Sequence, residues 1–151
     1  MPFRSTKTYG HELGLSCSFR QHRANSHCNL LHGYALSFKF TFEADELNEQ
    51  GWVQDFGGLK ALKVMLVAMF DHTLVVAKDD PHKSTFNALH LKKLADVRVV
   101  DGVGCEAFAR LAFDMAKDVI TETKTTSGQR VRVVSCECSE HGANGAIYIE
   151  E

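Results

Sequence analysis

The strictest constraint on the fold is a stretch in which apolar side chains alternate with smaller or polar ones. The apolar side chains occupy every second position, at Tyr34, Leu36, Phe38, Phe40 and Phe42. Because successive side chains of a β-strand point to opposite faces, this alternation predicts a long strand with one buried face. Such a face needs a second layer of structure to cover it.

Helical patterns supply that layer. Apolar residues recur at helical spacing from Lys60 to Phe70, and the stretch from Glu106 to Ile120 is rich in Ala and Phe. Both stretches predict helices. Shorter patterns predict strands at 13–19, 97–100, 131–135 and 146–149, and a short helix at 86–94. The main order is ββααββ, which indicates an α+β fold: a four-stranded antiparallel sheet with two main helices on one face.

Length, charge and cysteine content exclude several classes of protein. The 151 residues suit one domain spanning 1–151, and the net charge of −2 with no basic stripe argues against nucleic-acid binding. We expect no secretion leader and no membrane-spanning segment, because no apolar run has the required form. The five cysteines are odd in number, which fits a reducing compartment. These features predict a cytoplasmic protein.

One short segment carries most of the candidate chemistry. Cys28 and His32 lie four residues apart directly before the long strand, and His22 lies six residues before the thiol. In a reducing compartment, so dense a cluster favours metal binding or catalysis over a disulfide. Each residue also has an ordinary interpretation, as a buried thiol or a hydrogen-bonded histidine. The four other cysteines are expected in the core, at Cys17, Cys105, Cys136 and Cys138.

Further motifs follow in a fixed order along the chain. They are Cys28-Asn29-Leu30-Leu31-His32-Gly33-Tyr34, Gly51-Trp52-Val53-Gln54-Asp55-Phe56, Phe70-Asp71-His72, Glu106, and Glu140 eight residues before Tyr148. Together they resemble the motifs of the 6-pyruvoyltetrahydropterin synthase and 6-carboxytetrahydropterin synthase family of the tunnelling fold. The first motif is similar to the family's Cys-x-x-x-His-Gly-His. Its four-residue spacing is more like the bacterial 6-carboxytetrahydropterin synthase branch.

The resemblance implies a zinc enzyme with one departure from the family's ligand set. His22 and His32 match zinc histidines, but the family's third histidine is Tyr34 in this chain. Catalytic zinc usually keeps three protein ligands and one open position. Three explanations stay open: another residue replaces the ligand, the tyrosine oxygen binds zinc, or the metal has been lost. The candidate replacements are His11, His27 and His141.

The resemblance also implies roles in catalysis. Cys28 would accept a proton, the pair Asp71 and His72 would relay it, and Glu140 would bind the pterin ring and take part in the relay. The substrate would be 7,8-dihydroneopterin triphosphate, and the product 6-carboxytetrahydropterin, with release of acetaldehyde and triphosphate, on the way to queuosine and other 7-deazaguanines. Basic residues available for the triphosphate are Arg20, Arg23, Lys60 and Lys63.

Alternatives remain at this stage. One is a 6-pyruvoyltetrahydropterin synthase or another pterin side-chain lyase, and another is a metal-free pterin-binding module. Asp71 and His72 could equally end the preceding helix, and Asp79 and Asp80 are interpreted as solvated surface. Family members associate, usually as two stacked trimers with active sites shared between neighbouring subunits, so the resemblance implies a homohexamer.

Overall fold

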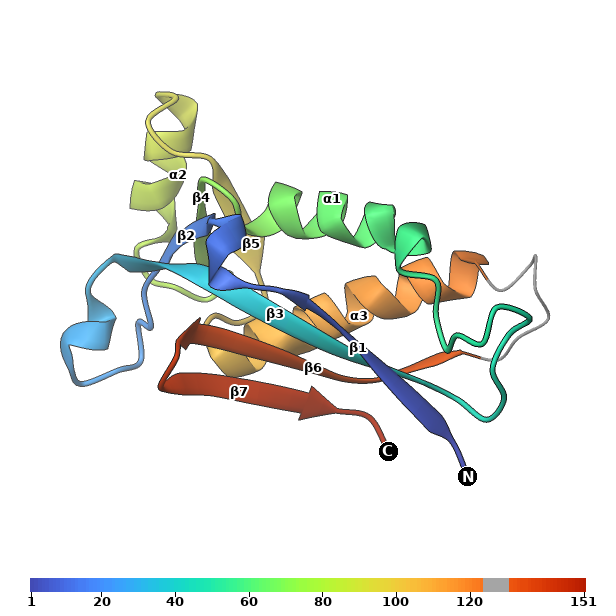
Figure 1. Ribbon diagram of the computed structural model, residues 1–151. Coiled ribbons are helices and arrows are strands. Elements are labelled where there is room, and N and C mark those ends of the chain that lie inside the picture. Colours follow the sequence, from blue (N-terminus) through green and yellow to red (C-terminus); the bar gives the residue numbers. More distant parts are fainter. Residues whose placement is uncertain (124–130) are drawn as a thin grey trace.

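The computed structural model describes residues 1–123 and 131–151, except for the side chains of residues 121–123. No helix within these residues is long and apolar enough to cross a membrane. Figure 1 shows the elements, which are α1 (Lys60–Phe70), α2 (Lys83–Leu91), α3 (Cys105–Thr123), β1 (Phe3–Tyr9), β2 (Leu15–Phe19), β3 (His32–Ala44), β4 (Thr73–Ala77), β5 (Val97–Val100), β6 (Arg132–His141) and β7 (Asn144–Ile149).

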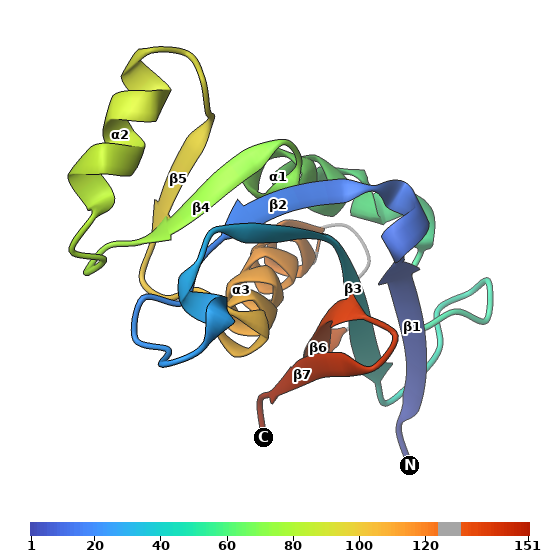
Figure 2. The ribbon, with the colours of Figure 1, turned by 90° about the vertical axis from the view of Figure 1, so that its left-hand side faces the viewer.

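The long strand β3 organises the sheet. Along one edge it pairs antiparallel with β2 through residues 32–36 and with β1 through residues 38–44. Along the other edge it pairs with β6, which in turn pairs with β7. On the far side of β2, β4 and β5 continue the sheet as parallel strands. Figure 2 shows how this sheet curves around α3.

The predicted four-stranded antiparallel sheet is wrong in its details, because the described residues form seven strands and two of the pairings are parallel. The sequence analysis missed β1 and β4. Strand β1 carries mainly polar, exposed side chains and lies at an edge, so its apolar signal is weak. Strand β4 is buried throughout, and a short continuous apolar run has no strand periodicity.

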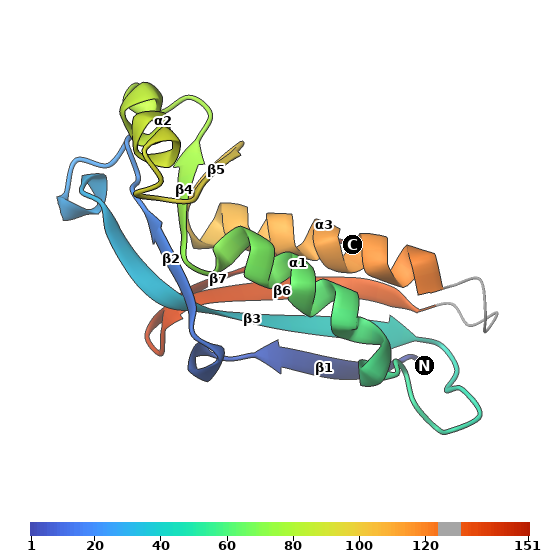
Figure 3. The ribbon, with the colours of Figure 1, turned by 90° about the horizontal axis from the view of Figure 1, so that it is seen from above.

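The predicted strand and helices otherwise form the core. Phe38, Phe40 and Phe42 are fully buried on the same face of β3, as the alternation requires. Both long helices pack against this face, as the sequence predicted; the Phe70 ring of α1 contacts Phe38 and also Phe108 of α3. Figure 3 shows α1 and α3 side by side over the sheet. Helix α2 lies apart, in a small second cluster with β4.

A buried ion pair fixes the loop that leads from β2 to β3. The Arg20 guanidinium donates two hydrogen bonds to Asp80, at 2.9 and 3.2 Å, and another to Asn29. The expectation that Asp80 is solvated is wrong, because its side chain is 1% exposed. Burial raises the pKa of Asp80, but hydrogen bonds from Arg20 and from the His82 backbone outweigh it, so the pKa lies below its ordinary value.

Replacing Arg20 by Ala tests this anchor. The variant leaves the Asp80 carboxylate buried without its partner, and we expect the free energy of unfolding to fall by about 3 kcal/mol in denaturant titrations at neutral pH. Since the folded chain holds the pKa of Asp80 down, the stabilisation is present above the ordinary carboxyl range and is lost as the pH falls.

Arg23→Ala is the matched control. Arg23 also pairs with an aspartate, Asp79, but the two side chains are 82% and 42% exposed. Exposed pairs contribute less than about 1 kcal/mol. Equal losses of stability in the two variants would contradict the assignment of Arg20 as the anchor of the loop.

Candidate active site

Tyr34 lies where the core-facing side of β3 extends beyond the hydrophobic core. With Leu36 it continues the row of buried phenylalanines, because residues two apart share a face. Its ring is half-buried and packs against three others, with centroid distances of 6.1 Å to Phe19, 5.5 Å to His32 and 6.0 Å to His141. Tyr34 is therefore the centre of an aromatic and imidazole cluster at this end of the sheet.

Glu140, near the end of β6, is one of the charged groups that act on the Tyr34 phenol. Burial raises the pKa of Tyr34 above its ordinary value, and the charges of Glu140 and Cys28 raise it further. The phenol is thus held in its neutral form. Glu140 and Cys28, which are far apart in the sequence, therefore act on the same phenol.

Cys105, the first residue of α3, ties that helix to β6. The Cys138 thiol and the Glu140 backbone N–H both donate hydrogen bonds to the Cys105 sulfur. The hydrogen bond from Cys138 lowers the pKa of Cys105 against the opposing effect of burial, and it raises the pKa of Cys138. A helix N-terminus also favours negative charge. The sequence analysis assigned Cys105 only to the core, although its position beside Glu106 at a helix start was a usable signal.

Cys28 belongs to the short 3₁₀ helix His27–Asn29 in the loop before β3. The Ser26 hydroxyl accepts a hydrogen bond from the Cys28 backbone N–H at 3.3 Å, and the Gln21 N–H donates to the Cys28 carbonyl at 2.9 Å. The Cys28 side chain is half-buried. These backbone hydrogen bonds hold Cys28 in a closed loop and leave its side chain partly accessible.

The candidate metal ligands do not converge. His32 donates from Nδ1 to the Leu30 carbonyl at 2.7 Å, because a carbonyl can only accept, and this leaves Nε2 available as a ligand. His22 instead has its Nε2 3.7 Å from Asp79 and lines a hollow of about 320 Å³ with Arg23. Across the part of the chain that the structure describes, no three His, Cys, Asp or Glu side chains are placed to hold a metal ion.

The candidate replacement histidines do not complete a ligand set either. His141 accepts a backbone N–H at Nδ1, so its neutral form carries the proton on Nε2 and offers no free lone pair. His11 bonds to the Ala35 carbonyl, and His27 is exposed. The three-ligand zinc set that the resemblance implies is therefore not assembled among the described side chains.

Asp71 and His72 form a pair away from Cys28. Their side chains bond at 2.8 Å, and Ser16 donates its backbone N–H to Asp71. The hydrogen bond from His72 lowers the pKa of Asp71, although burial opposes it. Asp71 also ends α1, so the helix-end interpretation is correct as well. His72 is 83% exposed, and the described residues contain no hydrogen bond or ion pair between this pair and Cys28.

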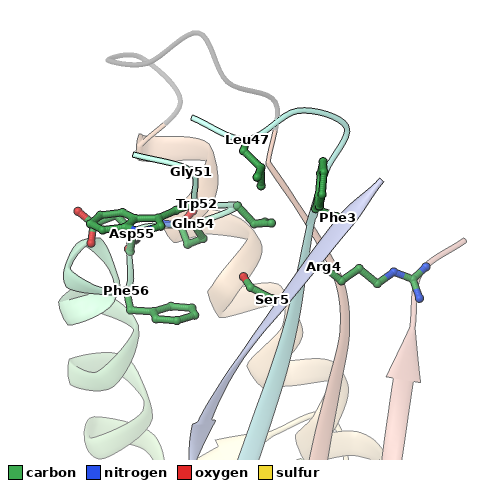
Figure 4. Close-up of a pocket in the computed structure, with 10 residues that line it drawn as sticks. Phe3, Arg4, Ser5, Leu47, Gly51, Trp52, Gln54, Asp55 and Phe56 are labelled. Carbon is green, nitrogen blue, oxygen red and sulfur yellow. Dashed lines mark hydrogen bonds between the residues drawn. The ribbon is translucent and has the colours of Figure 1, made fainter. Parts of the chain in front are cut away.

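A separate hollow of about 430 Å³ lies between β1 and the loop that precedes α1 (Figure 4). Its walls are largely apolar and include Phe3, Trp52 and Phe56. None of the predicted catalytic or metal-binding residues lines it. This apolar hollow and the Tyr34 cluster are therefore different places on the molecule.

Two known proteins have sequences similar to this chain. A 6-carboxy-5,6,7,8-tetrahydropterin synthase of Aquifex aeolicus is 26% identical over 141 residues, which cover 91% of this chain and 85% of the relative. The enzyme of the same name from Rickettsia typhi is 38% identical over 63 residues, which cover 39% of this chain and 46% of that protein's length. Both relatives therefore carry the activity that the sequence motifs suggested.

Solved structures show the same fold at low identity. An uncharacterized protein of Wolinella succinogenes superposes with a TM-score of 0.77 at 19% identity, covering 100% of this chain and 99% of that one. The 6-pyruvoyl tetrahydropterin synthase of Plasmodium vivax gives a TM-score of 0.67 at 13% identity, covering 98% and 97%. The model of the 6-pyruvoyl tetrahydropterin synthase family matches residues 10–151. The chain thus has the α+β tunnelling fold and belongs to the 6-pyruvoyl tetrahydropterin synthase family.

Proposed function

We propose that the protein is a lyase of the 6-carboxytetrahydropterin synthase type. It would convert 7,8-dihydroneopterin triphosphate to 6-carboxytetrahydropterin and release acetaldehyde and triphosphate. The observation that carries this proposal is that Cys28 and Glu140, which are far apart in the sequence, both act on the Tyr34 phenol. These two residues match the family's proton acceptor and its pterin anchor, which supports their assignment to one site.

Glu140 would bind the pterin ring. A carboxylate can accept two parallel hydrogen bonds from the adjacent ring N–H and amino group of a pterin. Cys28 would take the proton from the substrate side chain, for which its sulfur must be ionised. Its partly accessible position in the loop before β3 supports that role. These two contacts would fix the ring at one end and expose the side chain to a base at the other.

In this proposal, Asp71 and His72 act in the active site of a second copy of the chain. Their site is beside Ser16, and Cys28 lies past Phe19 at the other end of β2, about 10 Å along the strand. The pair is exposed, as a contribution to a neighbouring subunit's site would require. Strands β1 and β7 each pair along one edge within the described chain, so their outer edges are available for association.

The structure removes one of the four basic residues that the sequence offered for binding the triphosphate. Arg20 is committed to Asp80 and Asn29 and is 14% exposed, so we assign it to the structure of the loop rather than to the substrate. Arg23 remains accessible beside the same loop. Lys60 and Lys63 lie exposed on α1. Arg23 is therefore the residue that we would place against the triphosphate.

Zinc dependence is a separate part of the proposal, and the positions of the candidate ligands bear on it. His32 has the hydrogen-bonded form of a metal ligand, whereas His22 faces Asp79. No catalytic step is therefore assigned to the metal. The five free cysteines support a reducing compartment, and we place the enzyme in the cytoplasm, in the route to queuosine and related deazaguanines. A 6-pyruvoyltetrahydropterin synthase remains the second candidate.

The reaction is tested by incubating the purified protein with 7,8-dihydroneopterin triphosphate and measuring pterin products by mass spectrometry, together with acetaldehyde. We expect 6-carboxytetrahydropterin and acetaldehyde in equal amounts. Cys28→Ala should lower the rate by roughly 10²–10⁴-fold, as expected for removal of a general base. Asn25→Ala, an exposed change in the same loop, should leave the rate unchanged.

A 6-pyruvoyl product would select the second candidate, and an unchanged rate in Cys28→Ala would refute its assignment as the base. A parallel sample is treated with chelator and then resupplied with zinc. Loss of turnover with recovery on resupply would support zinc dependence. Full turnover in the chelator would contradict it.

Shared active sites are tested by mixing two inactive variants. Cys28→Ala and His72→Ala subunits, dissociated and reassembled together, should recover part of the activity, because some sites then combine an intact Cys28 with an intact His72. Each variant reassembled alone is the control. No recovery in mixed assemblies, or a monomer in light scattering at micromolar concentration, would contradict the sharing of sites.

A further inference from the structure

We propose that the surface hollow beside His72 binds the triphosphate group of the substrate, with Lys93 as its main cationic contact. This inference rests on the proposed function and deepens it, because it assigns the phosphate end of the substrate to the subunit that supplies His72. The hollow has a volume of about 630 Å³. His72 lines one side of it, and residues from the end of α2 up to Asp96 line the other.

Lys93 adopts a backbone conformation in which a lysine is strained. Its φ is +60°, in the left-handed region that favours glycine. The Lys93 N–H donates to the His90 carbonyl at 2.9 Å, and the Leu94 N–H donates to the Leu89 carbonyl at 2.9 Å. These two hydrogen bonds form a Schellman motif at the end of α2, in which the left-handed residue is usually glycine. The lysine side chain is therefore present at an energetic cost.

The hollow contains a second strained residue. His72 has a φ of +56°. Among the described residues, His72 and Lys93 are the only ones other than glycine with a positive φ, and both line this hollow. Strained backbone conformations cluster at binding and catalytic sites. The strain therefore distinguishes this hollow from those beside His22 and Trp52.

The charges around the hollow suit an anion. Within the described residues, the lysine ion pairs are those of Lys78 and Lys117, which leaves the exposed Lys93 without a carboxylate partner. The Asp96 carboxylate also lines the hollow, but the Arg98 guanidinium donates a hydrogen bond to each of its oxygens. The negative charge of Asp96 is thus balanced, whereas the positive charge of Lys93 is available to a ligand.

The two histidines add hydrogen-bonding groups. The His90 Nδ1 accepts the Val97 N–H at 3.0 Å, so the neutral ring carries its proton on Nε2 and can donate to a phosphate oxygen. His72 is bonded to Asp71 through Nδ1, which leaves Nε2 for the substrate. Phosphate oxygens bind lysine and N–H donors of this kind. The phosphates would then lie beside Lys93, and the reacting carbon side chain beside His72.

Titration with inorganic triphosphate tests the proposal, by isothermal calorimetry in low-salt buffer. We expect Lys93→Gly to weaken binding about tenfold, because it removes a hydrogen bond between charged groups. The same change should raise the melting temperature by about 2–4 °C, because glycine relieves the strain at this φ. Weaker binding by a more stable protein could not be ascribed to unfolding. Lys93→Arg keeps the charge and should retain most of the affinity.

Lys92→Ala is the matched control, because this neighbouring exposed lysine does not line the hollow. It should leave the affinity for triphosphate unchanged. Equal weakening in Lys92→Ala and Lys93→Gly would overturn the proposal, because binding would then follow net charge alone. Unchanged affinity in Lys93→Gly would also overturn it, as would a lack of binding to the unaltered chain.

Turnover assays separate this inference from the proposed function. With 7,8-dihydroneopterin triphosphate, Lys93→Gly should raise KM and leave kcat nearly unchanged, as expected when a binding contact is lost. Triphosphate binding that depends on Lys93, without any turnover, would support the hollow as a phosphate site and refute the proposed function. Turnover with unchanged KM and unchanged triphosphate affinity in Lys93→Gly would support the function and refute this inference.

Discussion

The two-residue period of β3 is the constraint on which the structure depends. Its core face carries the phenylalanines that pack against α1 and α3, and the same face continues past Leu36 to Tyr34 and His32. A shift of one residue in the pairing of β3 would bury the polar face and turn Tyr34 away from the site. The packing of the core and the geometry of the site are therefore set by one strand register.

The site is assembled by contacts between elements that are distant in the sequence. Glu140 on β6 acts on the pKa of Tyr34 on β3, and Cys138 and Glu140 on β6 act on the pKa of Cys105 at the start of α3. Gly104, directly before this helix, adopts φ +111°, a conformation that other residues rarely reach. That turn lets α3 begin beside β6.

Strong periodicity made β3 and α1 predictable, and α1 has the predicted bounds of Lys60–Phe70. Periodicity failed for β1, whose residues are mostly polar, and for β4, which is buried on both faces. At the site, the motifs predicted that Glu140 and Cys28 act together, and both residues influence the pKa of Tyr34. They could not show that Asp80 is buried under Arg20, because that pairing depends on how two loops approach each other in space.

A crystal structure of the protein with neopterin bound would test the central claim most directly. The account predicts that the ring N–H and the amino group of the pterin lie within hydrogen-bonding distance of the Glu140 carboxylate. A pterin bound elsewhere, such as in the apolar hollow beside Trp52, would contradict it.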